Sequence, residues 1–72
     1  MLTYKRICQK NNELTYEFYP DGNLKAPGVV VFYLDGTKEI LKDSEDDVKG
    51  YYSGHALNGI DITKENGTVA WC

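Results

Sequence analysis

Residues 29–42, VVVFYLDGTKEILK, hold two runs of strand-forming residues on either side of the pair Asp35 and Gly36. β-Branched and aromatic residues favour strands, and Asp-Gly between two such runs favours a two-residue hairpin turn. The stretch therefore predicts a hairpin of strands 29–34 and 37–42. The first strand is apolar on both faces, which predicts a place inside a sheet, with a helix over one side and a second subunit over the other. The second strand alternates lysine with isoleucine and so has one solvated face.

The chain before this hairpin alternates with a period of two residues, which is typical of half-buried strands. In residues 13–19, ELTYEFY, the side chains of Leu14, Tyr16 and Phe18 point to one side of the strand. Residues 3–9, TYKRICQ, show the same pattern in weaker form. The asparagines between the two runs suit a tight turn, because Asn tolerates the left-handed conformation. These residues predict a first hairpin, followed by a loop rich in proline and glycine.

After Ser44 the period changes, because apolar and small residues recur at three- and four-residue steps, as in an amphipathic helix. These residues are Val48, Tyr51, Tyr52, His55, Ala56, Gly59 and Ile60. Ser44 and Asp47 resemble a capping box, and the acidic residues around them would lie at the positive end of the helix dipole. The helix start is left open between about residue 47 and the position after Gly50. Gly50 and Gly54 share a helix face, which predicts a flat strip where another backbone approaches, either the sheet beneath or a neighbouring chain. Residues 68–72, TVAWC, predict a last short strand.

The order β-β-β-β-α-β predicts a single α+β domain over residues 1–72. We expect a mostly antiparallel five-stranded sheet, made of two hairpins and a C-terminal strand, with one helix packed on one face. One helix cannot cover both faces of such a sheet. The chain has six tyrosines, two phenylalanines and one tryptophan, and tyrosine and tryptophan suit surfaces that are partly wet and partly buried. We therefore expect a homodimer in which the second face is covered.

The composition limits the classes of function. With 72 residues, 42% of them hydrophobic and 26% charged, the chain is of ordinary globular composition and holds one domain at most. A net charge of -3 argues against a protein that grips a phosphate backbone, so nucleic acid is not an expected partner. The longest apolar run, GVVVFYL, is about a third of a membrane-spanning helix. The first residues lack the apolar stretch of a signal peptide, which predicts a cytoplasmic location.

The cysteines do not predict a metal site. Cys8 and Cys72 stand far apart, and with His55 they make three soft or imidazole ligands where a structural zinc site takes four. We expect neither a metal nor a cofactor. A disulfide between the two cysteines remains open if the terminal strands pair, whereas a reducing cytoplasm favours free thiols.

His55 is the only histidine, and on a helix it shares a face with Tyr51. A Tyr-His pair can move protons near neutral pH. We expect instead that the imidazole packs between sheet and helix, with one nitrogen bonded to a backbone carbonyl group. Ser53 points elsewhere on the helix, which excludes a simple Ser-His nucleophile. The acidic run at residues 43–47 is typical of a helix start, and it lacks the spacing of a calcium loop.

Aromatic residues that one helix cannot cover are candidates for contact with a partner or ligand. The candidate contact residues are Tyr51, Tyr52, His55, Tyr19 and Trp71. Binding to single-stranded nucleic acid would need the basic residues Lys5, Arg6 and Lys10 to cluster on one face.

The segments PDGN (residues 20–23) and EILK (residues 39–42) do not predict a nuclease site. Glu39 and Lys42 are three residues apart, and on a regular strand such residues face opposite sides.

Several short motifs follow one another over almost the full length of the chain. They are Tyr16, Phe18, Pro20, Asp21 and Gly22, then Pro27 and Gly28, then Gly54, His55 and Ala56, and last Glu65, Gly67, Val69, Ala70 and Trp71. In this order they resemble a group of small proteins of low-GC Gram-positive bacteria and their phages. Cys72 departs from that pattern, because an aromatic residue is expected there. The resemblance implies no activity, catalytic residue or cofactor.

Two hypotheses of different classes follow from the sequence. The first is a non-enzymatic, homodimeric protein-interaction module in the cytoplasm, because no convergent set of polar groups predicts a reaction. The alternative is a small ligand-binding protein or enzyme with a pocket around His55, Tyr51 and Tyr52.

Overall fold

The structure is a computed structural model, and it describes residues 1–45 and 50–70, except for the side chain of Tyr51. Its elements are β1 (Leu2–Lys10), β2 (Glu13–Pro20), β3 (Gly28–Tyr33), β4 (Lys38–Lys42), α1 (Tyr51–Gly59) and β5 (Asn66–Val69).

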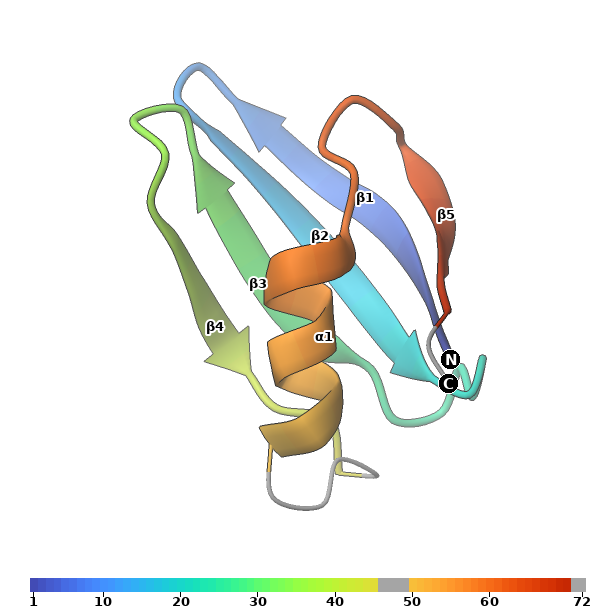
Figure 1. Ribbon diagram of the computed structural model, residues 1–72. Coiled ribbons are helices and arrows are strands. Elements are labelled where there is room, and N and C mark those ends of the chain that lie inside the picture. Colours follow the sequence, from blue (N-terminus) through green and yellow to red (C-terminus); the bar gives the residue numbers. More distant parts are fainter. Residues whose placement is uncertain (46–49, 71–72) are drawn as a thin grey trace.

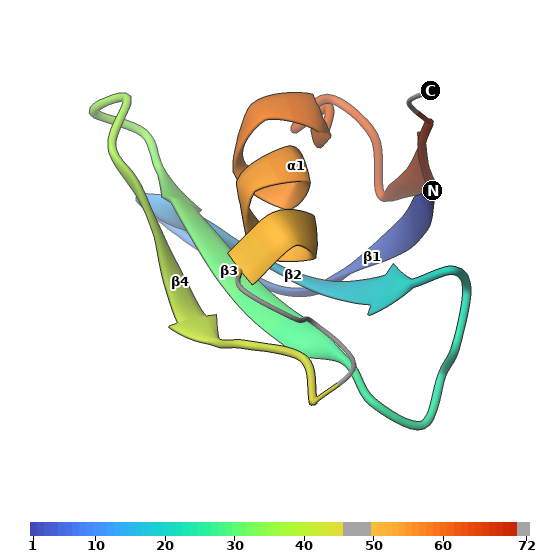
Figure 2. The same cartoon turned by 60° about the horizontal axis from the view of Figure 1, so that its bottom comes forward.

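The five strands form one antiparallel sheet in the order β4-β3-β2-β1-β5, and α1 lies on one face of it (Figure 1; Figure 2). The predicted α+β architecture and its element order are confirmed. β3 lies inside the sheet, as its apolar sequence predicts, and β4 is an edge strand. The last strand returns beside the first, with Leu2 opposite Val69.

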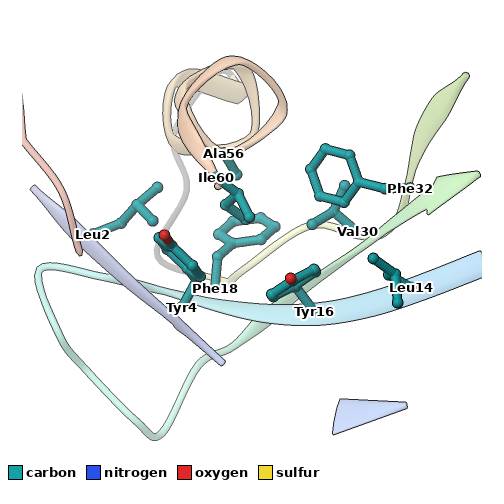
Figure 3. Close-up of a cluster of buried hydrophobic side chains, with 9 residues drawn as sticks. All are labelled: Leu2, Tyr4, Leu14, Tyr16, Phe18, Val30, Phe32, Ala56 and Ile60. Carbon is teal, nitrogen blue, oxygen red and sulfur yellow. The ribbon is translucent and has the colours of Figure 1, made fainter. Parts of the chain in front are cut away.

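The core fills the space between the sheet and α1 (Figure 3). Its buried residues are Leu2, Tyr4, Leu14, Tyr16, Phe18, Val30, Phe32, Ala56 and Ile60. Leu14, Tyr16 and Phe18 share the helix side, as the alternation in this strand predicts. The ring of Tyr16 meets those of Tyr4 and Phe32 edge to face, each at 5.8 Å between centroids, a favourable geometry for aromatic pairs.

Both hairpins are present, but their turns differ from the predicted ones. Asn11 and Asn12 form a two-residue turn, yet among the described residues the only non-glycine with a positive φ is Asp21, so the asparagines do not use the left-handed conformation. The second hairpin closes between Tyr33 N and Thr37 O at 2.8 Å, which makes a three-residue turn in place of a two-residue one. Gly36 takes its last position with φ 96°, a conformation that favours glycine.

The helix starts after Gly50, which is the later of the two starts that the sequence left open and not the one that the capping box favours. α1 begins at Tyr51 after Gly50, which has φ 71°, and its first turn contains no acidic residue. Ser44 is buried, and its hydroxyl donates a hydrogen bond to the carbonyl oxygen of Ala26. Ser44 therefore fastens the segment after β4 to the β2–β3 connection and does not cap α1. Asp47 lies outside the described residues.

The sheet does not approach the predicted glycine strip, and Gly50 and Gly54 do not both belong to the helix. Gly50 precedes the helix, and Gly54 faces open space, with nothing within 4 Å of the position a Cβ would take. The close approach occurs at Gly59, where a Cβ would lie 2.5 Å from Val69 Cγ1. Gly59 thus lets the end of α1 pack against β5.

Two irregularities change which residues share a face. β1 shifts register between Arg6 and Cys8, and the β3–β4 pairing shifts by one residue at Leu41. The last strand, β5, begins two residues earlier than predicted and ends at Val69. Residues 71 and 72 of the predicted strand lie outside the described part of the chain.

Candidate functional site

The sheet face opposite α1 is the most distinctive surface, and we call it the open face. Figure 2 shows α1 on the other side of the sheet. The strand registers place these residues on the open face: Thr3, Lys5, Cys8 and Lys10 of β1, Glu13, Thr15, Glu17 and Tyr19 of β2, Val29, Val31 and Tyr33 of β3, Glu39 and Lys42 of β4, and Asn66 and Thr68 of β5.

Opposite charges face one another across β1 and β2. Lys5 lies directly opposite Glu17, and Lys10 lies opposite Glu13 with 3.9 Å between Nζ and Oε1. Opposite-charge pairs across antiparallel strands stabilise their register. On the open face, β1 therefore carries positive charges and β2 carries negative ones.

Two apolar side chains of the open face are buried, although no helix covers it. Val31 is 2% exposed and Tyr19 is 9% exposed, and neither belongs to the helix-side core. The Tyr19 hydroxyl donates a hydrogen bond to Glu17 Oε1 at 2.8 Å. Burial, together with the hydrogen bond and the charge of Glu17, raises the pKa of Tyr19 to about 12. Side chains of the face therefore cover part of its apolar surface themselves.

Leu41 is the extra residue in β4, and it brings Glu39 and Lys42 to the same face. Glu39 lies opposite Val31 and Lys42 lies opposite Val29. The sequence argument that separated this pair was wrong, because it assumed a regular strand. A nuclease arrangement still does not form. Asp21 accepts a hydrogen bond from the Tyr52 hydroxyl at 2.9 Å, which holds its carboxylate toward α1.

The predicted contact residues are divided between the two sides of the sheet. Tyr19 lies on the open face, whereas Tyr52 and His55 lie on α1 and are partly buried. The side chain of Tyr51 and all of Trp71 lie outside the described residues. Ser53 donates a hydrogen bond to Asp43 Oδ1 at 2.7 Å, which ties the start of α1 to the end of β4.

The three basic residues of β1 are divided in the same way. Lys5 and Lys10 lie on the open face, but Arg6 lies on the helix side with its guanidinium 5.5 Å from the centroid of the Tyr16 ring. The condition for a nucleic-acid surface, one face for all three, is not met.

Arg6 and Tyr16 belong to a network that the sequence argument missed. The Tyr16 hydroxyl donates to the carbonyl oxygen of Lys64 at 2.7 Å and accepts from Arg6 Nη2 at 3.1 Å. Arg6 also donates to the carbonyl oxygen of Ile62 at 3.0 Å, and Asp61 N donates to the Tyr4 hydroxyl at 3.3 Å. The available signal was the alternation in β1, which puts Arg6 on the side of Tyr4. The network fastens the α1–β5 connection to the sheet.

Residues 1–45 and 50–70 offer no enclosed site and no membrane-spanning helix. These residues enclose no pocket and contain no group of three or more His, Cys, Asp or Glu side chains placed to hold a metal ion. No helix in this part of the chain has the length and apolar character needed to cross a membrane. Cys8 is exposed on the open face, and the predicted alternative of a bond to Cys72 falls outside the described residues.

No family model, curated protein or solved structure matches the chain. The resemblance to small proteins of low-GC Gram-positive bacteria and their phages therefore stays a prediction.

Proposed function

We propose that the chain is a non-enzymatic protein-interaction module that forms a homodimer through the open face. The observation that carries this proposal is a sheet face that no helix covers, with opposite charges on its two neighbouring strands, where Lys5 of β1 lies opposite Glu17 of β2. Charges of opposite sign on one face can meet complementary charges of a second copy, and such complementarity directs association. The helix side of the sheet has no such role to play, because α1 and the core occupy it.

The size of the face is compatible with a dimer. The longest extents of the molecule are 31 and 22 Å, so one face projects roughly 700 Å², close to the ~800 Å² per partner of a standard interface. A smaller or imperfectly packed overlap would give a weaker, concentration-dependent dimer.

Stacking through the open face leaves α1 on the outside of both copies. Two of the predicted contact residues, the partly buried Tyr52 and His55, belong to this helix, and it is our candidate site for a further protein partner. An exposed thiol on the contact face, Cys8, persists most readily in a reducing compartment. This supports the proposal that the module works in the cytoplasm.

Sedimentation velocity over a range of protein concentrations tests the dimer. We expect a concentration-dependent shift from the 8.2 kDa chain to a species of twice that mass. A monomer at every concentration up to about 1 mM would overturn the proposal, because dissociation constants above that value correspond to less than about 4 kcal/mol of binding free energy.

Thiol reactivity tests whether the open face is the contact surface. In a Cys72→Ser variant, Cys8 should react more slowly with a thiol reagent as the dimer forms. The matched control carries Asn58→Cys together with Cys8→Ser and Cys72→Ser, because Asn58 is exposed on α1. Its reaction rate should not depend on protein concentration. Equal protection at both positions would contradict contact through the open face.

A further inference from the structure

We infer that the two open faces stack about a two-fold axis that runs parallel to the strands between β1 and β2. This inference rests on the proposed homodimer and specifies its geometry. It follows from the charges on the open face, where β1 carries Lys5 and Lys10 and β2 carries Glu13 and Glu17. The molecule that covers the open face is a second copy of the chain.

The strand register determines what such an axis brings together. A two-fold axis between β1 and β2 places β1 of one copy over β2 of the other. The rotation does not change the position of a residue along the strand direction, so each residue of β1 lies over the residue of β2 that is its partner in the sheet. Lys5 then lies over Glu17 of the second copy, and Lys10 lies over Glu13. Because a two-fold contact is used twice, the interface holds two of each pair.

The uncharged residues of β1 and β2 on the open face also fit this arrangement. Tyr19 would lie over Thr3 of the second copy, a large side chain against a small one, and Cys8 would lie over Thr15. Stacked sheets are about 10 Å apart and cross at about 30°. β1 and β2 lie next to the axis, so the crossing displaces their residues little, and long lysine side chains span the displacement that remains.

Other axes give poorer electrostatic matches. An axis directly over β2 places Glu13 against Glu13 of the second copy, and Glu17 against Glu17 of the second copy. An axis between β2 and β3 places β1 of one copy over β4 of the other. Lys5 then lies on Lys42, because both are at the same position along the strands as Glu17. Like charges placed face to face cost several kcal/mol at an interface.

An axis that runs across the strands is the strongest competitor. It would pair Glu39 with Lys42 of the second copy and would leave Lys5 and Glu17 without partners of opposite charge. In the geometry we infer, β4 extends beyond the second sheet, so Glu39 and Lys42 stay in solvent. The two geometries therefore differ in which charge pair matters.

A charge-swap mixing experiment separates them. Lys5→Glu alone and Glu17→Lys alone should each raise the dimer Kd by about tenfold or more, because each places like charges together twice. An equimolar mixture, with one variant labelled with ¹⁵N, should form the heterodimer in preference to either homodimer by native mass spectrometry. Within each chain, residues 5 and 17 carry like charges in both species, so the preference reports only contacts between copies.

The matched control is the mixture of Glu39→Lys and Lys42→Glu, which has the same net charges and lies on the same face. It should show no preference for the heterodimer. If a variant at residue 5 or 17 does not fold by circular dichroism, Lys10→Glu mixed with Glu13→Lys should give the same preference.

Each outcome has a definite meaning. A wild-type dimer without heterodimer preference would overturn the inferred axis and leave the proposed function standing. A preference found only in the control mixture would replace the inferred axis with one across the strands. A wild-type monomer would overturn the proposed function and this geometry together.

Discussion

Gly28 stands where β3 passes the ring of Phe18, and only a hydrogen atom fits between them. A Cβ at this position would lie 2.1 Å from Phe18 Cζ. Gly28→Ala should therefore lower the free energy of unfolding by about 1–3 kcal/mol or more, because a buried ring and a sheet backbone must both shift. Urea unfolding followed by circular dichroism measures this change.

Gly54→Ala is the control for that substitution. Gly54 lies inside α1 with open space around it, so alanine should raise the free energy of unfolding by up to about 1 kcal/mol. If both variants were equally stable, the close contact between Gly28 and Phe18 would be contradicted.

Tyr19 predicts an alkaline loss of stability. Its folded pKa is about 12 because of burial and of Glu17, compared with about 10 in an unfolded chain. A raised folded pKa contributes stability that is complete below pH 10 and is lost as the pH rises toward 12. The contribution is at most about 3 kcal/mol. Urea unfolding between pH 9 and pH 12 should show a smaller decline for Tyr19→Phe than for wild type, and equal declines would refute this assignment.

At the scale of elements, the connection between α1 and β5 depends on hydrogen bonds to the sheet. Tyr16 is fully buried, and its hydroxyl bonds both Arg6 and the carbonyl oxygen of Lys64. Tyr16→Phe should lower the free energy of unfolding by about 1–3 kcal/mol, because buried polar groups lose a partner. Amide hydrogen exchange in β5 should become faster.

Tyr33→Phe is the matched control for the loss of a tyrosine hydroxyl. Tyr33 also donates a hydrogen bond, to Glu39 Oε1 at 2.9 Å, but that bond is exposed to solvent. Its loss should change stability little, and exchange in β5 should stay unchanged. Faster exchange in both variants would argue against a specific anchor at Tyr16.

The regular elements were predictable because their signals are local. Alternating apolar residues predicted β1 and β2, and the valine-rich run predicted β3 inside the sheet. The start of α1 was left open between about residue 47 and the position after Gly50, and the structure has the later start. The capping pattern could not decide this, because Ser44 bonds a carbonyl group in another loop, a tertiary contact. The shared face of Glu39 and Lys42 was missed for a similar reason, since nothing near Leu41 in the sequence signals a bulge.

The candidate site was predictable only in part. Tyr19, Tyr52 and His55 are all partly or largely buried, as aromatic and imidazole groups commonly are. Which side of the sheet each one takes depends on strand register and on the position of α1. The sequence also predicted an uncovered second face, but it did not predict that Val31 would be 2% exposed there without a partner.

At the scale of the whole molecule, the proposed dimer should be sensitive to salt. Its inferred interface contains Lys5 with Glu17 and Lys10 with Glu13, each used twice. Raising sodium chloride from about 0.05 to about 1 M shortens the Debye length to about 3 Å and weakens such pairs. The dimer Kd measured by sedimentation should therefore rise with salt. A Kd that is constant or falls with salt would indicate a mainly apolar interface.

The pairing of β1 with β5 also bears on how the chain acquires its fold. Leu2 and Val69 are neighbours in the sheet although nearly the whole sequence separates them, and closing so long a loop is a late and slow event. On the ribosome, β1 emerges first and β5 emerges after every other element. The outer edge of β1 therefore stays unpaired until β5 emerges, and in that interval the nascent chain can mispair at this edge.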